Sequence, residues 1–380
     1  MLIAHVLAAA IKPALVGAAI TASAAGGFAA WQYTQGDGAT AFQRVQSAGQ
    51  RLLISEFAED ADTIVAIDPA DPQGARTQIA RIGHAPGYGI FAALSPAGDA
   101  IAYTALPADT SKPAPDAPAI AAIVEDDGDV VTLATDIDLL IPPIWSPDGA
   151  SIVVRKNTPA ANSAGRFELI LLGRDGSRST ITSWSSAAVF PIAFSPDGAA
   201  LYFATLDETG VDLYSVAPDG AAETKIAHLS DDIARDWKLS PDGSTLAYSV
   251  ALSGAQPRVV TMTLDLATAV AAEAVAKSAG AEFNPAWRPD GELTIASVDA
   301  QGGGAVSVDA TGATEQITGN DGAIDLPLGW SPDGATLAVR TIEGATPFEA
   351  GESHLELVTQ HGGRERISDS ADVLIVGWME

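Results

Sequence analysis

The chain has 380 residues, of which 20 are Lys or Arg and 48 are Asp or Glu, so its formal net charge is −28 near pH 7. This charge excludes proteins that follow nucleic acid by neutralising phosphates, and attachment to anionic lipid headgroups through a polybasic segment. A hydrophobic share of 47% argues against general disorder. The absence of cysteine excludes disulfides, thiolate metal sites and a cysteine nucleophile.

The N-terminal residues differ from the rest of the chain. Residues 13–31 carry no charge, and as a helix they would span about 28 Å, close to the roughly 30 Å hydrocarbon core of a bilayer. We therefore expect residues 1–33 to form a retained transmembrane anchor and residues 34–46 a linker. Lys12 precedes the apolar run and the first acid follows it, which places the body of the protein outside the cytoplasm.

Two alternatives remain open for this segment. Ala22-Ser23-Ala24 fits the small-residue pattern of a signal-peptide cleavage site, which would release the body into the periplasm or the medium. A buried helix of a soluble protein is the other alternative.

One five-residue motif recurs along the remainder of the chain. A large apolar residue is followed by Ser, Pro, Asp and Gly, with Ala for Asp in the first copy and Arg for Ser in the fifth. The copies begin at Leu94, Trp145, Phe194, Leu239, Trp287 and Trp330. Proline presets the first central position of a turn, Asp suits the second and Gly the residue after it, so the motif predicts a hairpin turn.

The motif residues are expected to be structural. The large apolar residue would wedge between neighbouring repeats, and Trp378 shares that position because it follows Trp330 by one repeat length. The intact turns are expected at Pro147, Asp148, Gly149, Pro196, Asp197, Gly198, Pro241, Asp242, Gly243, Pro289, Asp290, Gly291, Pro332, Asp333 and Gly334.

Each repeat continues with further strand-like stretches. Four short strands in 40–50 residues are typical of a β-propeller blade. The C-terminal stretch ADVLIVGWME resembles a first strand without its turn, and RLLISEF after Gly49 begins a unit that lacks a first strand. Pairing the two would close the ring and hide free sheet edges. We therefore predict an all-β fold: a seven-bladed propeller over residues 47–380, with six blades as the alternative, preceded by one apolar helix.

The turn motif and the Leu-Ala-Tyr-like strand after it resemble the repeats of TolB-like propellers. Related repeats occur in the propeller domains of prolyl oligopeptidases and dipeptidyl peptidases. The resemblance covers roughly residues 43–380 and implies the fold. It implies no catalytic residue, because in this family the turn motif is structural. TolB itself has six blades and an additional N-terminal domain, for which residues 1–50 are too short.

The sequence contains few candidates for chemistry. The Gly-x-Ser-x-Gly elbow that an attached hydrolase domain would require is missing, and the five histidines show no tight ligand spacing. The acid clusters at 59–62, 125–129 and 320–322 could bind Ca²⁺, but Asp and Gly are also ordinary turn residues. We expect no catalytic residue, no cofactor and no metal ligand, with Ca²⁺ as the one ion left open.

These observations favour a function based on binding. We expect a membrane-tethered scaffold or accessory subunit of a respiratory, photosynthetic or envelope complex, whose partners are membrane-protein subunits. The alternatives are a periplasmic hydrolase or lactonase with a metal on the propeller axis, and a periplasmic ligand or glycan sensor. Trp184 and Trp237 lie outside the repeat position, which makes them candidates for contact with a partner or ligand.

Overall fold

A computed structural model describes residues 49–114, 116–160, 163–253, 258–276, 280–299, 302–319, 322–343, 351–359, 362–368 and 372–379. The predicted anchor and linker lie outside these residues. The described residues form strands, turns and loops and contain no helix. Accordingly, no helix in this part of the chain has the length and apolarity needed to cross a membrane.

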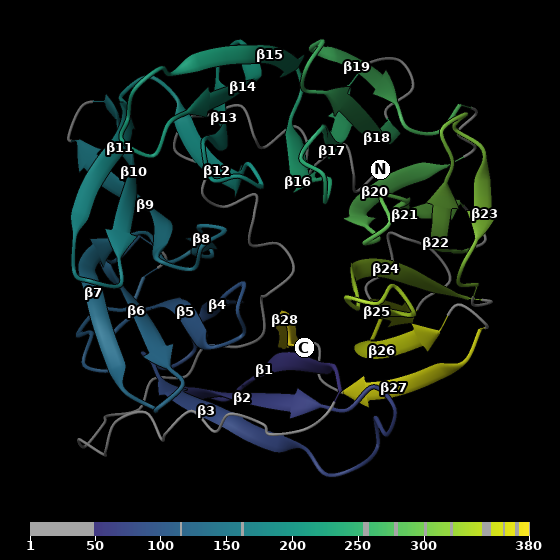
Figure 1. The fold of residues 1–380 in the computed structure, drawn as a ribbon, viewed down its shortest axis with the longest axis horizontal. Coiled ribbons are helices and arrows are strands. Elements are labelled where there is room, and N and C mark those ends of the chain that lie inside the picture. Colours follow the sequence, from purple (N-terminus) through teal and green to yellow (C-terminus); the bar gives the residue numbers. More distant parts are fainter. Residues whose placement is uncertain are drawn as a thin grey trace.

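The strands follow one another round a ring in chain order (Figure 1). Four separate sheets of four strands lie next to one another along the ring. They contain β4 (Phe91–Leu94), β5 (Ala100–Ala105), β6 (Ala119–Glu125) and β7 (Val130–Ile137); β8 (Ile144–Trp145), β9 (Ser151–Ala160), β10 (Ser163–Gly173) and β11 (Arg178–Trp184); β12 (Ala188–Phe194), β13 (Leu201–Asp207), β14 (Gly210–Val216) and β15 (Thr224–Ser230); and β16 (Ala234–Leu239), β17 (Thr245–Leu252), β18 (Arg258–Asp265) and β19 (Val270–Glu273).

The fifth separate sheet lies at the seam, where the two ends of the ring meet. It orders β28 (Val373–Met379), β1 (Arg51–Phe57), β2 (Ala61–Ile67) and β3 (Thr77–Gly83). Strand β28 runs antiparallel to β1, with Leu52 opposite Trp378. The predicted closure of the ring by the C-terminal strand is therefore confirmed.

The predicted count of seven blades, and the alternative of six, are wrong. Five blades are separate four-stranded sheets. The remaining strands share one eight-stranded sheet, made of β20 (Ala281–Trp287), β21 (Leu293–Asp299), β22 (Gly302–Val308), β23 (Thr314–Gln316), β24 (Ala323–Trp330), β25 (Thr336–Glu343), β26 (Ser353–Thr359) and β27 (Arg364–Ser368).

Glycines explain how these eight strands join. A parallel pair between Gly303 of β22 and Ile324 of β24 links the two halves of the sheet. Strand β22 begins with three glycines, and β23 covers only its last three residues. Because no side chain stands on Gly304, the carbonyl oxygen of Thr318 occupies space only 1.9 Å from where a Cβ would lie. Neighbouring backbone can therefore approach this half of β22 closely.

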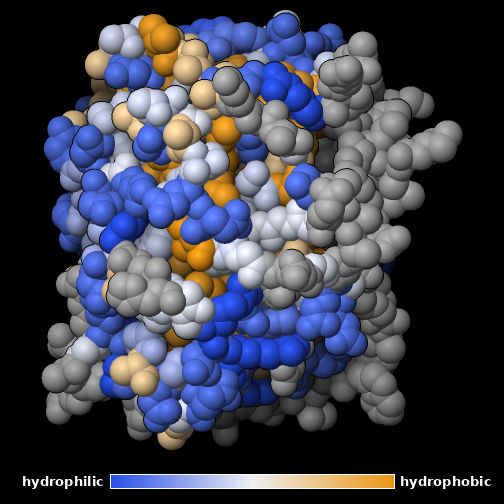
Figure 2. All heavy atoms as spheres, turned by 90° about the vertical axis from the view of Figure 1, so that its right-hand side faces the viewer, coloured by the Kyte–Doolittle hydropathy of each residue, from blue (hydrophilic) through white to orange (hydrophobic). Residues whose placement is uncertain are grey.

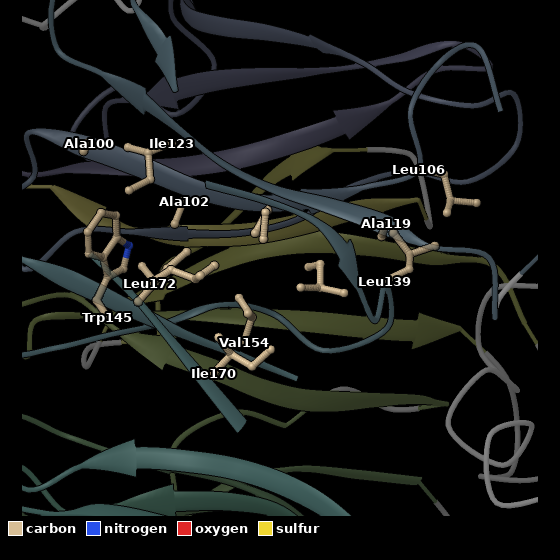
Figure 3. Packing of buried hydrophobic residues seen from close by; sticks show 14 of the residues in the cluster. Ala100, Ala102, Leu106, Ala119, Ile123, Leu139, Trp145, Val154, Ile170 and Leu172 are labelled. Atoms are coloured by element: carbon tan, nitrogen blue, oxygen red, sulfur yellow. The ribbon is translucent and has the colours of Figure 1, made fainter. Parts of the chain in front are cut away.

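The core lies between consecutive sheets. Strand β5 is buried at all six positions, because sheets pack against both of its faces. Figure 3 shows one such interface, where Trp145 of β8 lies with Ala102, Ile123 and Leu172 between two sheets. On the outside, the flank that carries β20–β27 is mostly hydrophilic and is interrupted by a narrow hydrophobic stripe (Figure 2).

Candidate functional site

Each of the six motif copies forms a tight turn between an innermost strand and the next strand of its sheet. We name the turns by their first residue: Ser95, Ser146, Ser195, Ser240, Arg288 and Ser331. In every turn the glycine N–H donates to the carbonyl of that first residue at 2.8–2.9 Å. The six glycines have φ between 67° and 92°, a backbone conformation that residues with a side chain rarely adopt. They are Gly98, Gly149, Gly198, Gly243, Gly291 and Gly334.

In four of these turns the serine hydroxyl donates a hydrogen bond to the motif aspartate, whereas in the Ser95 turn, which has Ala97 at that position, it donates to Asp99. In the Ser195 turn, Ser195 Oγ donates to Asp197 Oδ1 at 2.6 Å and accepts from Ala200 N at 3.0 Å. Ser146, Ser240 and Ser331 make the same bond at the same length. The serine hydroxyl and a backbone N–H hold the pKa of Asp148, Asp197, Asp242 and Asp333 below the ordinary value of an aspartate.

Neighbouring turns also pack against one another through proline and glycine. A Cβ on Gly149, Gly198 or Gly243 would lie 3.9, 3.7 or 2.4 Å from Cδ of the proline in the preceding turn. Gly334 likewise faces Pro289, at 3.6 Å. The motif therefore serves two purposes, because its Pro and Gly fix each turn and also lock it to its neighbour.

The Arg288 turn departs from this pattern. Among the described residues, nothing lies within 4 Å of where a Cβ on Gly291 would stand. This turn is also one residue shorter, because Arg288 N bonds the carbonyl of Glu292, the fifth residue of the turn, whereas Ser240 N bonds that of Thr245, the sixth. A cavity of about 170 Å³ opens between the two turns, and we call it the turn gap. It is lined by Ser240, Pro241, Asp242, Ser244, Thr245, Trp287, Pro289, Asp290 and Gly291.

The large residues at the repeat position lie between neighbouring sheets. Trp145 Nε1 donates to the carbonyl of Ala93, and Trp287 Nε1 to that of Lys238, in each case on the innermost strand of the preceding sheet. Trp330 Nε1 donates to Thr294 Oγ1 at 3.0 Å. Phe194 is buried, whereas Leu94, Leu239 and Trp378 are partly buried.

A second cavity, of about 160 Å³, lies beside the seam between β28 and β4. Its walls are almost entirely apolar, and Leu374, with 44% of its surface exposed, is one of its lining residues. The one polar side chain in the lining is Ser55, whose hydroxyl donates to Asp62 at 3.0 Å. We call it the seam cavity, and its other lining residues are Ile90, Phe91, Ala92, Pro142, Ile375 and Val376.

The innermost strands divide into an apolar and a polar group. Strands β28, β4, β8 and β12 carry no charged residue, whereas β16, β20 and β24 do. Lys238 on β16 is exposed, yet protein atoms crowd round it and the resulting desolvation lowers the pKa of its ammonium group. This combination is expected on a concave surface.

Backbone bulges occur in inner strands of both groups, including β12 and β24, and in two strands of the polar group they contain a non-glycine residue at positive φ. The register of β16 shifts between Arg235 and Lys238, and that of β20 between Phe283 and Ala286. Asp236 and Asn284, one in each bulge, have φ of 58° and 53°. Such bulges bend a strand and change the direction of its side chains.

Two buried clusters of titratable groups are held mainly by hydrogen bonds within the protein, although His354 Nδ1 in the second cluster has no hydrogen-bond partner among the described residues. In the first, Asp62 accepts hydrogen bonds from Ser55 Oγ and Ile90 N, and its Oδ1 lies 2.9 Å from His84 Nε2. The hydroxyl of Ser55 bonds the carboxylate and not the imidazole. His84 therefore does not hold the position of a base that activates a serine nucleophile.

The second cluster joins strands β24 to β27. Arg364 binds both carboxylate oxygens of buried Asp325, at 2.8 and 2.9 Å, and also Glu356. Burial alone would raise the pKa of Asp325, but hydrogen bonds from Arg364 and Thr341 outweigh it and lower that pKa. His354 Nε2 lies 2.9 Å from Glu356 Oε1. The carboxylate of Asp325 therefore has a structural role, because its hydrogen bonds are made by side chains of the protein itself.

The two tryptophans singled out as contact residues are half-buried. Trp184 packs edge-on against Tyr214, with ring centroids 5.0 Å apart, and donates to Thr182 Oγ1. Trp237 packs against Phe190, and its Nε1 atom is buried with no hydrogen-bond partner among the described residues. Both rings therefore make internal contacts, and their role toward a partner stays a prediction.

Within the described residues, the side chains of the acid clusters have internal partners or lie in turns. Asp62 is engaged with His84, whereas Asp60 faces Arg81. Residues 125–129 form the turn between β6 and β7, in which Gly128 N bonds the carbonyl of Glu125. Asn320, Asp321, His5 and His361 lie outside the described residues. Within the described part, no three His, Asp or Glu side chains come together as metal ligands do.

The fold has many structural relatives, but sequence comparison identifies none. No protein-family model and no curated protein sequence matches the chain. A proposed 6-phosphogluconolactonase of Bacteroides uniformis matches with a TM-score of 0.53 and 13% identity, over 86% of this chain and 99% of its own. Dipeptidyl peptidase 4 of Porphyromonas gingivalis matches with a TM-score of 0.51 and 14% identity, over 83% of this chain and 49% of its own.

TolB of Acinetobacter baumannii is also among the matches, with a TM-score of 0.47 and 16% identity over 85% of this chain and 81% of its own. The resemblance to the propellers of dipeptidyl peptidases, predicted from the repeat, is confirmed at the level of fold by the match to dipeptidyl peptidase 4. The chain is a β-propeller similar in fold to these proteins.

Proposed function

We propose that the chain acts by binding another protein, as a scaffold or accessory subunit of a membrane-protein complex. The observation that carries this proposal is the seam cavity. Its walls are apolar, and the hydroxyl of its one polar side chain, Ser55, is already engaged with Asp62. Such a recess suits an apolar side chain of a partner, because apolar contact is the main source of affinity in protein interfaces.

The proposal includes a location. The apolar residues 13–31 would hold the propeller at the outer face of a membrane, where the partner subunits lie. The chain has 48 acidic and 20 basic residues, and this excess of negative charge favours partners with neutral or basic surfaces.

Leu374 provides the test. The variant Leu374→Asp would place a charge in the lining of the seam cavity, on a residue that is 44% exposed, so the fold should tolerate it. The matched control is Val270→Asp on the outer strand β19, where the side chain is 64% exposed. Native mass spectrometry of the detergent-extracted protein from its own host should show a partner with the wild type and the control.

The Leu374→Asp variant should lose that partner while keeping the melting temperature of the control. A wild-type protein that is purified only as a monomer would contradict the proposed function. Equal capture by the two variants would remove the seam cavity as its basis.

A further inference from the structure

The side chains that line the turn gap offer hydrogen-bond acceptors to a ligand, because their donors already bind acceptors within the protein. Ser240 Oγ and Ser244 Oγ donate to Asp242, and Trp287 Nε1 donates to the carbonyl of Lys238. The Thr245 hydroxyl lies 3.3 Å from Ser244 Oγ. The side chains that line the gap therefore leave carboxylate oxygens and an indole ring for a ligand. A sugar or another polyol needs donors as well as acceptors, so it is poorly matched to this lining.

Asp290 differs from the corresponding aspartates of the neighbouring turns. In the Ser195 and Ser240 turns the serine hydroxyl occupies one oxygen of the aspartate. Arg288 stands in place of that serine, and its guanidinium lies over the ring of Trp330, 5.4 Å from the centroid, on the side of the following turn. Asp290 Oδ1 accepts a long bond from Glu292 N, at 3.2 Å, and its Oδ2 lies 3.5 Å from Arg288 Nε. The Asp290 side chain is nevertheless 57% exposed, so a ligand can reach its carboxylate.

We propose that the turn gap is a binding site for the guanidinium group of an arginine on a partner protein. A guanidinium carries five donors and no acceptor, and it can pair with a carboxylate while its flat face stacks on an aromatic ring. Asp242 and Asp290 supply the carboxylates and Trp287 the ring. The overall charge of −28 adds a long-range attraction for a basic partner.

The inference rests on the proposed function in one respect, since the partner supplies the arginine. The site itself can be tested without that partner. Methylguanidinium chloride is the probe, and the neutral isostere N-methylurea is the control ligand. Binding to the full-length protein in detergent can be measured by saturation-transfer NMR titration. Methylguanidinium should bind and N-methylurea should not.

The variant Asp290→Asn should weaken methylguanidinium binding about fivefold or more, because it removes a charge that forms a charge-assisted hydrogen bond. The matched control is Asp197→Asn, at the same motif position beside a closed junction, where Gly243 packs on Pro196. This control should bind as the wild type does. Equal weakening by both variants, or binding of N-methylurea as strong as that of methylguanidinium, would overturn the proposal.

A second variant tests the site by filling it with a cation from the protein itself. Ser244 is exposed and lines the cavity, so Ser244→Lys would place a tethered cation beside Asp242 and Asp290. Added methylguanidinium should no longer bind, while the protein stays folded. Unchanged binding would overturn the site. Because these experiments involve no partner, their failure is distinguishable from the loss of a co-purifying subunit in the Leu374→Asp experiment.

Discussion

The Ser240 and Arg288 turns have nearly the same sequence and opposite surroundings. In the first, Gly243 lies so close to Pro196 that an added Cβ would stand 2.4 Å from the proline ring. In the second, Gly291 faces open space among the described residues. The Arg288 turn differs from the Ser240 turn by one residue fewer and by an arginine in place of serine, and these differences accompany the loss of the glycine–proline contact. A repeated motif can therefore be structural in most copies and line a site in one.

Adding a methyl group to each glycine should give the largest difference between the turns. Gly243→Ala should cost about 3 kcal/mol, because the left-handed backbone strains the side chain by about 1–2 kcal/mol and overpacking against Pro196 adds a similar amount. Gly291→Ala meets the first cost alone, about 1 kcal/mol. Urea unfolding of both variants measures the difference. Equal losses of stability would mean that the proline–glycine contact does not lock the turns.

Acid should weaken the stabilisation that Asp197 gives to its turn. The pKa of Asp197 is lowered by the hydroxyl of Ser195, so this carboxylate stabilises the fold above its unfolded pKa of about 3.9, and the stabilisation fades as the pH falls through the lower folded value. Asp197→Asn should therefore lower the melting temperature near pH 7 and flatten its decline in acid. Asp290→Asn should change the melting temperature less, since no serine bonds Asp290. Melting curves between pH 2 and pH 7 would show this, and identical curves for the two variants would refute it.

Restoring the consensus residue should have the smallest effect on stability. Arg288→Ser would offer Asp290 the hydroxyl that the other turns have, but it would lose the contact with Trp330, the bond to Glu292 and the ion pair with Asp290. The two changes oppose each other, so the free energy of unfolding should move by less than about 1 kcal/mol. Methylguanidinium binding should nevertheless strengthen, because the variant removes a guanidinium that lies 3.5 Å from Asp290 Oδ2 and leaves a neutral hydroxyl in its place. Weaker binding by this variant would contradict the account of the turn gap.

The motif predicted the turns, the strands after them and the closure of the ring, because each depends on local backbone preferences and on a regular spacing. It did not predict the sheet shared by β20–β27, which depends on glycines of β22 that belong to no motif. The pair of Asp325 and Arg364 was likewise beyond sequence reasoning, because the two residues are 39 positions apart in the chain.

The candidate site was only partly within reach of the sequence. The arginine at position 288 is visible as the one departure from Ser in the motif. Its consequence depends on where the neighbouring proline lies, which needs coordinates. The seam cavity could not have been found from sequence, since β1, β4 and β28 contribute to it from distant parts of the chain.

The pairing of β28 with β1 also sets an order of events during synthesis. Strand β1 leaves the ribosome among the first strands of the propeller, yet its neighbour on the inner side lies more than three hundred residues later. Until Val373–Met379 emerges, the inner edge of β1 can pair with any other exposed strand, including one from a second nascent chain. The earliest sheet of the propeller to begin folding is thus the last to be completed.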